Sequence, residues 1–303
     1  MYIKFIFLNI ILIIINNVYI KIRKIEKVKI CLCTIGKEEN LYAREFVSHY
    51  KRYNIDKIII YDNNEIKGEK FEDVLNDYIS NRFVELIDIR GKLSQQLDAY
   101  RNCFESFKNK FDWFIFYDMD EFIYLKKIKN MKYYLSKSSF KHCQAIQLNM
   151  YFHTDNNQLY YENKTLFERF KEKVKSKQGV LKTIIRSNIN IKIKSPHFLN
   201  KKLITCDGFG KHNKEIKNFV YTNKPDFKYH YIDHFSYKST EEFARKIMRG
   251  SAIKGFETEM KYRKISWYFD SNKIKKEKID LIENLTNLNL SKYRTRLVEQ
   301  NTT

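Results

Sequence analysis

The sequence predicts an α/β fold with a mostly parallel sheet and helices on both faces. Two observations predict it. Apolar runs alternate with segments of helical spacing between residues 27 and 122, and each apolar run ends in polar residues. Strands that alternate with helices are typical of parallel sheets, since the helix carries the chain back to the start of the next strand. The 303 residues include only 8 Gly and 2 Pro, which leaves little material for flexible linkers.

The expected elements follow from local patterns, taken in chain order. VKICLCTIG is an apolar run with the length of a strand. The segment after it has apolar residues at helical spacing. DKIIIYDNN and FVELIDIRG are further apolar runs, and SQQLDAYRNCFESFKNKF is an amphipathic helix. DWFIFYDMDEF is a fourth strand with charge at its end. We expect strands at 28–36, 56–64, 83–91 and 112–122, and helices at 39–54, 71–79 and 94–111.

The two ends of the chain differ from the rest. Residues 5–15 are apolar except for Asn9, and basic residues follow them. This run is shorter than the roughly 20 residues of a membrane span, and no small-residue cleavage site follows. We expect 1–24 to be a membrane anchor or surface helix, 25–265 to be the main domain and 266–303 to be a helical tail.

Charge and cysteine content suggest partners and a compartment. Lys and Arg number 57 against 36 acidic residues, a net charge of +21, which favours anionic partners. An AT-biased genome would produce a similar excess of lysine. The five cysteines include no CxxC pair, so we expect reduced, mostly buried thiols. The protein is then expected to be membrane-associated and to face the cytoplasm.

The polar strand ends indicate where a ligand would bind. In open α/β sheets the ligand crevice lies outside the carboxyl ends of the strands. Asp118 and Asp120 follow a buried run, and just beyond a strand both could reach one cation. Mg²⁺ and Mn²⁺ prefer carboxylate oxygens and bridge phosphates well. The alternative is that Asp118 caps a helix and Glu121 is solvated.

Several blocks, in one order, resemble glycosyltransferase family 92 and related family 2-type enzymes. KEENLYAREFVSHYKRYNIDKIIIYDNN is similar to the family's opening, and QLDAYRNC to a second block. DWFIFYDMDEFI matches the block that in the family carries the metal and the donor diphosphate. YFHTDNNQLYYENKTLFERF and HFSYKSTEEFARKIMRG resemble later blocks, so the likeness runs from about residue 28 to 250. The chain departs from the pattern at Glu38, Phe46 and His153.

The resemblance implies a GT-A (Rossmann-like) fold, in which a nucleotide-binding half joins a smaller acceptor-binding half. It also implies a metal-dependent inverting reaction. The expected donor is a nucleotide sugar of the UDP class, the cofactor is Mn²⁺ or Mg²⁺, and the acceptor is a glycan or a glycolipid. Which sugar is moved, and to which hydroxyl, depends on pocket shape.

Site residues are carried over from the matching positions. Asp118 and Asp120 would hold the metal, with Asp118 also near the ribose, and His234 is the candidate third ligand, with His230 and His197 as rivals. Inversion needs a base for the acceptor hydroxyl, and Asp155 is the first choice, with Glu168 second, although Glu168 could instead pair with Arg169. The nucleotide pocket would be lined by Thr34, Lys37, Glu39, Asp62 and Gln96, and the diphosphate could be touched by Lys182, Arg186, Lys246 and Arg249.

Two other classes of function compete with this interpretation. A basic nucleic-acid-binding protein would suit the charge, but the sequence has no zinc-finger spacing, RNP motif or concentrated basic arm. We therefore do not expect nucleic acid as a partner. An Asp-dependent metal phosphohydrolase usually follows its Asp-x-Asp with Thr or Val, whereas Glu121 and Phe122 stand here. The Walker loop and the Gly-x-Ser-x-Gly elbow are also missing.

Overall fold

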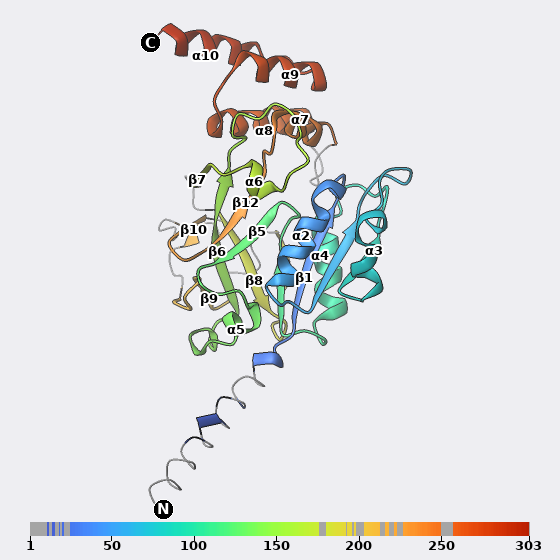
Figure 1. Ribbon diagram of the computed structural model, residues 1–303, viewed down its shortest axis with the longest axis vertical. Helices are drawn as coiled ribbons and strands as arrows, with labels where there is room; N and C mark the ends of the chain where they lie inside the picture. The colour runs from blue at the N-terminus through green and yellow to red at the C-terminus, as the bar shows by residue number, and fades with distance from the viewer. Residues whose placement is uncertain are drawn as a thin grey trace, which may run out of the picture.

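Figure 1 shows a computed structural model of the chain. It describes residues 25–175, 180–191, 193–195, 197, 203–212, 216–217, 221–222, 227–249 and 257–302, with isolated positions between 11 and 20. Most of the predicted N-terminal anchor therefore lies outside the described residues. Within the described part of the chain, no helix has the length and apolar character needed to cross a bilayer.

Four parallel strands form the first half of the main sheet, in the order β3-β2-β1-β4. Parallel pairing brings their carboxyl ends to one edge of the sheet. The strands are β1 (Ile30–Gly36), β2 (Lys57–Asp62), β3 (Val84–Asp88) and β4 (Trp113–Phe116). The predicted α/β fold is thus confirmed.

Helices cover both faces of these strands because successive side chains point to opposite sides. Leu32 and Ile58 pack with helices α2 (Asn40–Arg52) and α3 (Glu72–Ser80) on one face. Cys33 and Ile59 pack with α4 (Gln96–Phe107) on the other. Figure 1 shows α2 and α3 in front of the strands and α4 behind them.

The predicted strand 112–122 is in fact two strands joined by an acidic turn. β4 ends at Phe116, and β5 (Glu121–Leu125) starts after Asp118 and Asp120. The sheet order continues β4-β8-β6-β12-β5, so β4 and β5 are far apart in the sheet although they are neighbours in the chain. The sheet must curl for the short turn to join them.

The second half of the sheet mixes parallel and antiparallel pairings. Short elements flank it, and β10 pairs only with β11. Its strands are β6 (Ala145–His153), β7 (Lys173–Lys175), β8 (Leu181–Arg186), β9 (Thr205–Cys206) and β12 (His230–His234), and the short elements are α5 (Met131–Leu135), η1 (Ser138–Phe140), α6 (Leu166–Arg169), β10 (Ile216–Lys217) and β11 (Tyr221–Thr222).

Four C-terminal helices build a separate apolar cluster at one end of the sheet (Figure 1). Phe243, Tyr268 and Ile279 are buried together there. The expected boundary after residue 265 falls inside α8 (Glu257–Ser271), and the described residues after it are largely helical. The helices are α7 (Thr240–Met248), α8 (Glu257–Ser271), α9 (Lys276–Thr286) and α10 (Ser291–Thr302).

Asp155 ties this helical cluster to the end of β6. Its carboxylate accepts hydrogen bonds from the Tyr268 hydroxyl at 2.5 Å and pairs with the Lys278 ammonium at 2.5 Å. Its backbone N–H donates to Asn272 Oδ1 at 2.7 Å. Asp155 is 2% exposed and Lys278 is fully buried. A buried carboxylate with these partners joins α8 and α9 to the sheet.

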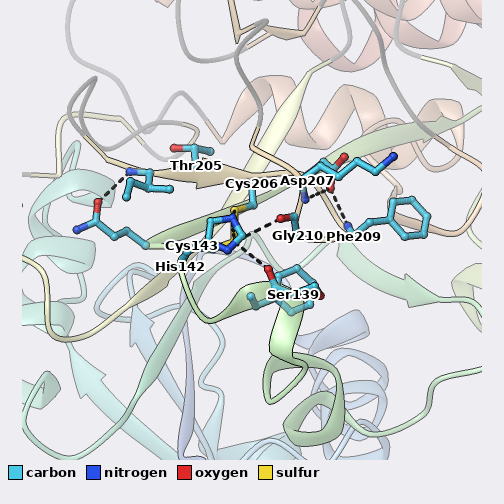
Figure 2. Close-up of a disulfide and its surroundings, with 12 residues drawn as sticks. Ser139, His142, Cys143, Thr205, Cys206, Asp207, Phe209 and Gly210 are labelled. Atoms are coloured by element: carbon cyan, nitrogen blue, oxygen red, sulfur yellow. Dashed lines mark hydrogen bonds between the residues drawn. A yellow bond between two sulfur atoms is a disulfide. The ribbon is translucent and has the colours of Figure 1, made fainter.

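Two disulfides overturn the expectation that all five cysteines are reduced thiols. Cys33 is bonded to Cys103, and Cys143 to Cys206, while Cys31 is free and buried. The partners are 70 and 63 residues apart, so packing of β1 on α4, and of β6 beside β9, decides the pairing. Figure 2 shows the imidazole of His142 beside the Cys143–Cys206 bond.

A thiol count tests the disulfides. Protein denatured without reductant should expose one titratable thiol, from Cys31, and five after reduction. In the chain-entropy description each loop of this length contributes about 4 kcal/mol to the free energy of unfolding. Reduction should therefore lower the midpoint of urea unfolding. Five thiols before reduction would contradict the pairing.

Substitution of Asp155 tests its structural role. Asp155→Asn leaves the buried Lys278 ammonium without its counter-charge, so the free energy of unfolding should fall by about 3 kcal/mol. Urea denaturation followed by circular dichroism measures it. The double variant Asp155→Asn/Lys278→Met removes the orphaned charge as well, and should recover much of the loss. An Asp155→Asn protein of unchanged stability but without turnover would instead support the catalytic role expected from sequence.

Candidate active site

A cavity of about 530 Å³ opens at the carboxyl ends of β1, β2 and β4. Gly36, at the end of β1, leaves room for the acidic turn, because an added Cβ would lie 2.9 Å from Met119 Cε and 2.5 Å from Phe71 Cζ. The backbone then turns at Glu38, whose φ is 54° and whose N–H donates to Asn64 Oδ1. The cavity therefore occupies the place that the polar strand ends predicted.

Asp118 is held by three donors from different elements. Gln96 Nε2 and the Tyr100 hydroxyl of α4 donate to its Oδ1 at 2.8 and 2.9 Å. Lys182 Nζ of β8 donates to its Oδ2 at 3.0 Å. Burial alone would raise the pKa of Asp118, but the charge of the Lys182 ammonium and its hydrogen bond, together with His197, outweigh burial, and the pKa lies below its ordinary value. Asp118 is therefore an ionised, oriented carboxylate on the cavity wall.

Asp120 is paired with two groups from the second half of the chain. Lys246 Nζ lies 2.7 Å from its Oδ2, and His234 Nε2 lies 3.4 Å from its Oδ1. Burial acts to raise the pKa of Asp120, yet the Lys246 ammonium and His234 lower it well below its ordinary value. The carboxylate is 4% exposed and lines the cavity.

Glu121 completes a compact set of possible metal ligands with Asp120 and His234. One ligand atom from each of these three lies within 4.8 Å of the others. Glu121 Oε1 and His234 Nδ1 are buried and have no hydrogen-bond partner among the described residues. Burial raises the pKa of Glu121 well above its ordinary value. Two carboxylates and an imidazole suit Mn²⁺ or Mg²⁺, so these residues fit a divalent cation.

The predicted metal set is thus brought together only in part. Asp120 and His234 meet as expected, but Glu121 takes the third place in the cluster and Asp118 is held by Lys182. His197 lines the same cavity, with burial lowering its pKa to about 4. The other rival, His230, packs against Tyr134 away from the cavity.

The predicted nucleotide-binding residues divide into two groups. Lys37, Glu39 and Gln96 line the cavity, as does Asp118. Glu39 is buried between two cations, with Lys238 Nζ at 2.9 Å and Arg249 Nη2 at 2.8 Å. These four residues line the same cavity, and their role in nucleotide binding stays a prediction.

Thr34 and Asp62 do not reach the cavity wall. Thr34 is fully buried within β1. Asp62 Oδ1 accepts from the N–H of Asn64 at 3.0 Å, in a turn of the kind that Asp and Asn favour without any ligand. Asn63 lines the cavity in its place. Thr34 and Asp62 are thus not part of the cavity lining, and their contacts with the donor stay predictions.

Both predicted bases lie outside the cavity. Asp155 is occupied by Lys278 and Tyr268. Glu168 is exposed and forms a capping box at the start of α6, where its Oε2 accepts from Thr165 Oγ1 at 2.7 Å. The alternative pair of Glu168 with Arg169 is also wrong, since Arg169 pairs with Glu242.

The cations that were predicted to touch the diphosphate divide, and three further residues of the cavity lining had no predicted role. Lys246 and Arg249 line the cavity, whereas Arg186 lies over the Trp113 ring. Lys182 is fully buried and bridges Asp118 and Glu121, at 3.0 Å from each. Met260, Lys264 and Trp267 of α8 also line the cavity. In the sequence these three residues of α8 show only helical spacing, and this spacing is common on any amphipathic helix.

Comparisons with known proteins agree on one family. The family model for glycosyltransferase family 92 matches residues 26–290. A glycosyltransferase family 92 protein of Oryza sativa subsp. japonica is 28% identical over 94 residues, which are 31% of this chain and 16% of the rice protein. The match thus spans about a sixth of that relative.

The chain is also similar to solved structures of S. aureus TarS. The structure of TarS 1–349 in complex with UDP aligns with a TM-score of 0.39 and 10% identity, and covers 80% of this chain and 71% of that one. A longer TarS structure aligns with a TM-score of 0.38 and covers 43% of that chain. The family model spans most of the residues that build the sheet and the cavity, and the chain belongs to glycosyltransferase family 92.

Proposed function

We propose that the protein is a metal-dependent, inverting glycosyltransferase that moves a sugar from a UDP-sugar to a glycan or lipid-linked acceptor. The observation that supports it most is the cavity at the strand ends, which Asp118, Asp120 and His234 line, with the buried Glu121 close to Asp120 and His234. A departing nucleoside diphosphate requires cationic groups, and this site offers both cations and a ligand set for a metal.

The residues of the chain divide the work of donor binding. Asp120, Glu121 and His234 would hold the divalent cation, which when bound neutralises charge on the leaving diphosphate. Lys246 and Arg249 supply fixed positive charge on the same cavity wall. Gln96 and Tyr100 keep Asp118 in one orientation through their hydrogen bonds, so that carboxylate is pre-organised for the donor.

The transfer itself is a direct displacement. The acceptor hydroxyl oxygen forms a bond to the anomeric carbon while the bond from that carbon to the diphosphate oxygen breaks, so the configuration inverts and the nucleoside diphosphate leaves. The hydroxyl proton passes to a base at the cavity wall. Among the described residues that line the cavity, the groups able to take it are Glu39, Asp118, Asp120, His197 and His234.

The disulfides bear on where this reaction takes place. Disulfides persist in oxidising compartments and are rare in the cytosol. The expected cytoplasmic orientation rested on reduced thiols, and four of the five cysteines are paired. We therefore propose that the domain faces an oxidising compartment. The net charge of +21 remains consistent with work beside an anionic membrane surface.

Removal of one carboxylate tests the function. In the intact protein, UDP together with Mn²⁺ should raise the unfolding temperature, because a ligand at a hundred times its Kd adds about 2.7 kcal/mol of stability. UDP without metal should have little effect. Asp120→Ala should lose the response, since it removes the carboxylate shared by the metal set and Lys246. Differential scanning fluorimetry measures the shift.

Asp73→Ala is the matched control, because Asp73 is an exposed aspartate on α3 outside the cavity. It should keep the full response to UDP and Mn²⁺. An equal shift in Asp120→Ala would refute the assigned site. Stabilisation by duplex DNA at physiological salt, without any response to UDP, would favour the nucleic-acid-binding alternative.

A further inference from the structure

One wall of the cavity comes from α8, a helix that begins beyond the region where the sequence resemblance was visible. Met260, Lys264 and Trp267 line the cavity. They are four and three residues apart, so they project from one face of the helix. The opposite part of the lining comes from the strand ends, including Gly36 and Asn63. The cavity thus has a strand-end side and an α8 side, with Asp120 part of the same lining.

Lys264 differs from the other half-buried cations of the cavity. Lys246 pairs with Asp120, and Arg249 with Glu39. No carboxylate of the described residues contacts Lys264 Nζ. Burial, together with the positive charges of Lys246 and Arg249, lowers the pKa of Lys264 to about 8. An anionic group bound in the cavity would supply the missing counter-charge.

Aromatic side chains share the lining of the cavity with this lysine. The Trp267 side chain is 46% exposed although it lines the cavity, and the Arg263 guanidinium lies 4.8 Å from its ring centroid. Phe152 and Tyr237 belong to the same lining. The apolar C–H face of a pyranose ring packs well on such aromatic surfaces. The α8 side therefore combines sugar-binding surface with a free positive charge.

The position of α8 is held firmly. The Tyr237 hydroxyl donates to the Trp267 carbonyl oxygen at 3.1 Å and lies 3.1 Å from Ser271 Oγ. Tyr268, the next residue after Trp267, is bonded to Asp155. These hydrogen bonds hold the face of α8 in a fixed position at the cavity.

We propose that the α8 face formed by Met260, Lys264 and Trp267 binds the acceptor, and that the acceptor is an acidic glycan. Trp267 would pack against a sugar ring, and Lys264 would pair with a carboxylate, sulfate or phosphate carried by that sugar or its neighbour. This inference rests on the proposed transferase function and adds the chemical class of its acceptor. The alternative, in which Lys264 binds the donor diphosphate, is an outcome of the test.

The experiment compares four proteins on a glycan array, with UDP and Mn²⁺ present. The array carries each acidic glycan beside its neutral counterpart, including oligogalacturonate with its methyl ester and mannose 6-phosphate with mannose. The proteins are the unaltered chain, Lys264→Met, Trp267→Leu and the control Lys261→Met. Lys261 lies on the same helix but does not line the cavity. The carboxylate and phosphate probes distinguish two of the three anionic groups that the proposal names.

The unaltered chain and Lys261→Met should retain acidic glycans about tenfold more strongly than their neutral counterparts, the effect of one charge-assisted hydrogen bond. Lys264→Met should lose that preference, and Trp267→Leu should weaken retention of both kinds. UDP affinity, measured by calorimetry, should stay within about twofold in all variants.

Three results would overturn the proposal. They are retention of neutral glycans alone or of no glycan, an unchanged preference in Lys264→Met, and a loss of UDP affinity in Lys264→Met, which would assign Lys264 to the donor diphosphate. In each case a normal response to UDP and Mn²⁺ would leave the transferase assignment standing. Failure of the unaltered chain to bind UDP would instead refute the assignment itself.

Discussion

Buried carboxylates at the ends of the parallel strands must be matched by cations, and much of the structure depends on that requirement. A carboxylate taken out of water without a partner costs several kcal/mol. Here the acidic groups sit at the edge of an apolar sheet, and all of them except Asp118, whose side chain is 32% exposed, are almost completely buried. Their cations come from β8 and from the segment around α7. The carboxylates are Glu39, Asp118, Asp120 and Glu121, and the cations are Lys182, Lys238, Lys246 and Arg249.

These ion pairs between carboxylates and cations connect the two halves of the sheet. The acidic turn is local to residues 116–121, but Lys182 and Lys246 reach it only when β8 and α7 are in place. The curl of the sheet follows, because β4 and β5 are separated by three other strands and yet are joined by the short turn that carries Asp118 and Asp120. Part of the large positive charge of the chain is thus internal and structural.

A paired, buried carboxylate also positions the C-terminal helices, and one of these, α8, forms one side of the cavity. Asp155 does not reach the cavity, but with Lys278, Tyr268 and Asn272 it holds α8 and α9 against the end of β6. Asp155, which the sequence predicted to be the catalytic base, therefore supports the site without lining the cavity. It positions the helix that presents Lys264 and Trp267.

The sequence by itself determined the α/β class, the order of the first strands and helices, and the place of Asp118 and Asp120 at the rim of the sheet. These features depend on patterns within about 15 residues, such as apolar runs and helical spacing. Only the tertiary structure decided that Glu121 joins Asp120 and His234, that four cysteines are paired and that α8 lines the cavity. The physical reason is that each of these contacts joins side chains brought together by packing and sheet register, which local sequence patterns do not encode.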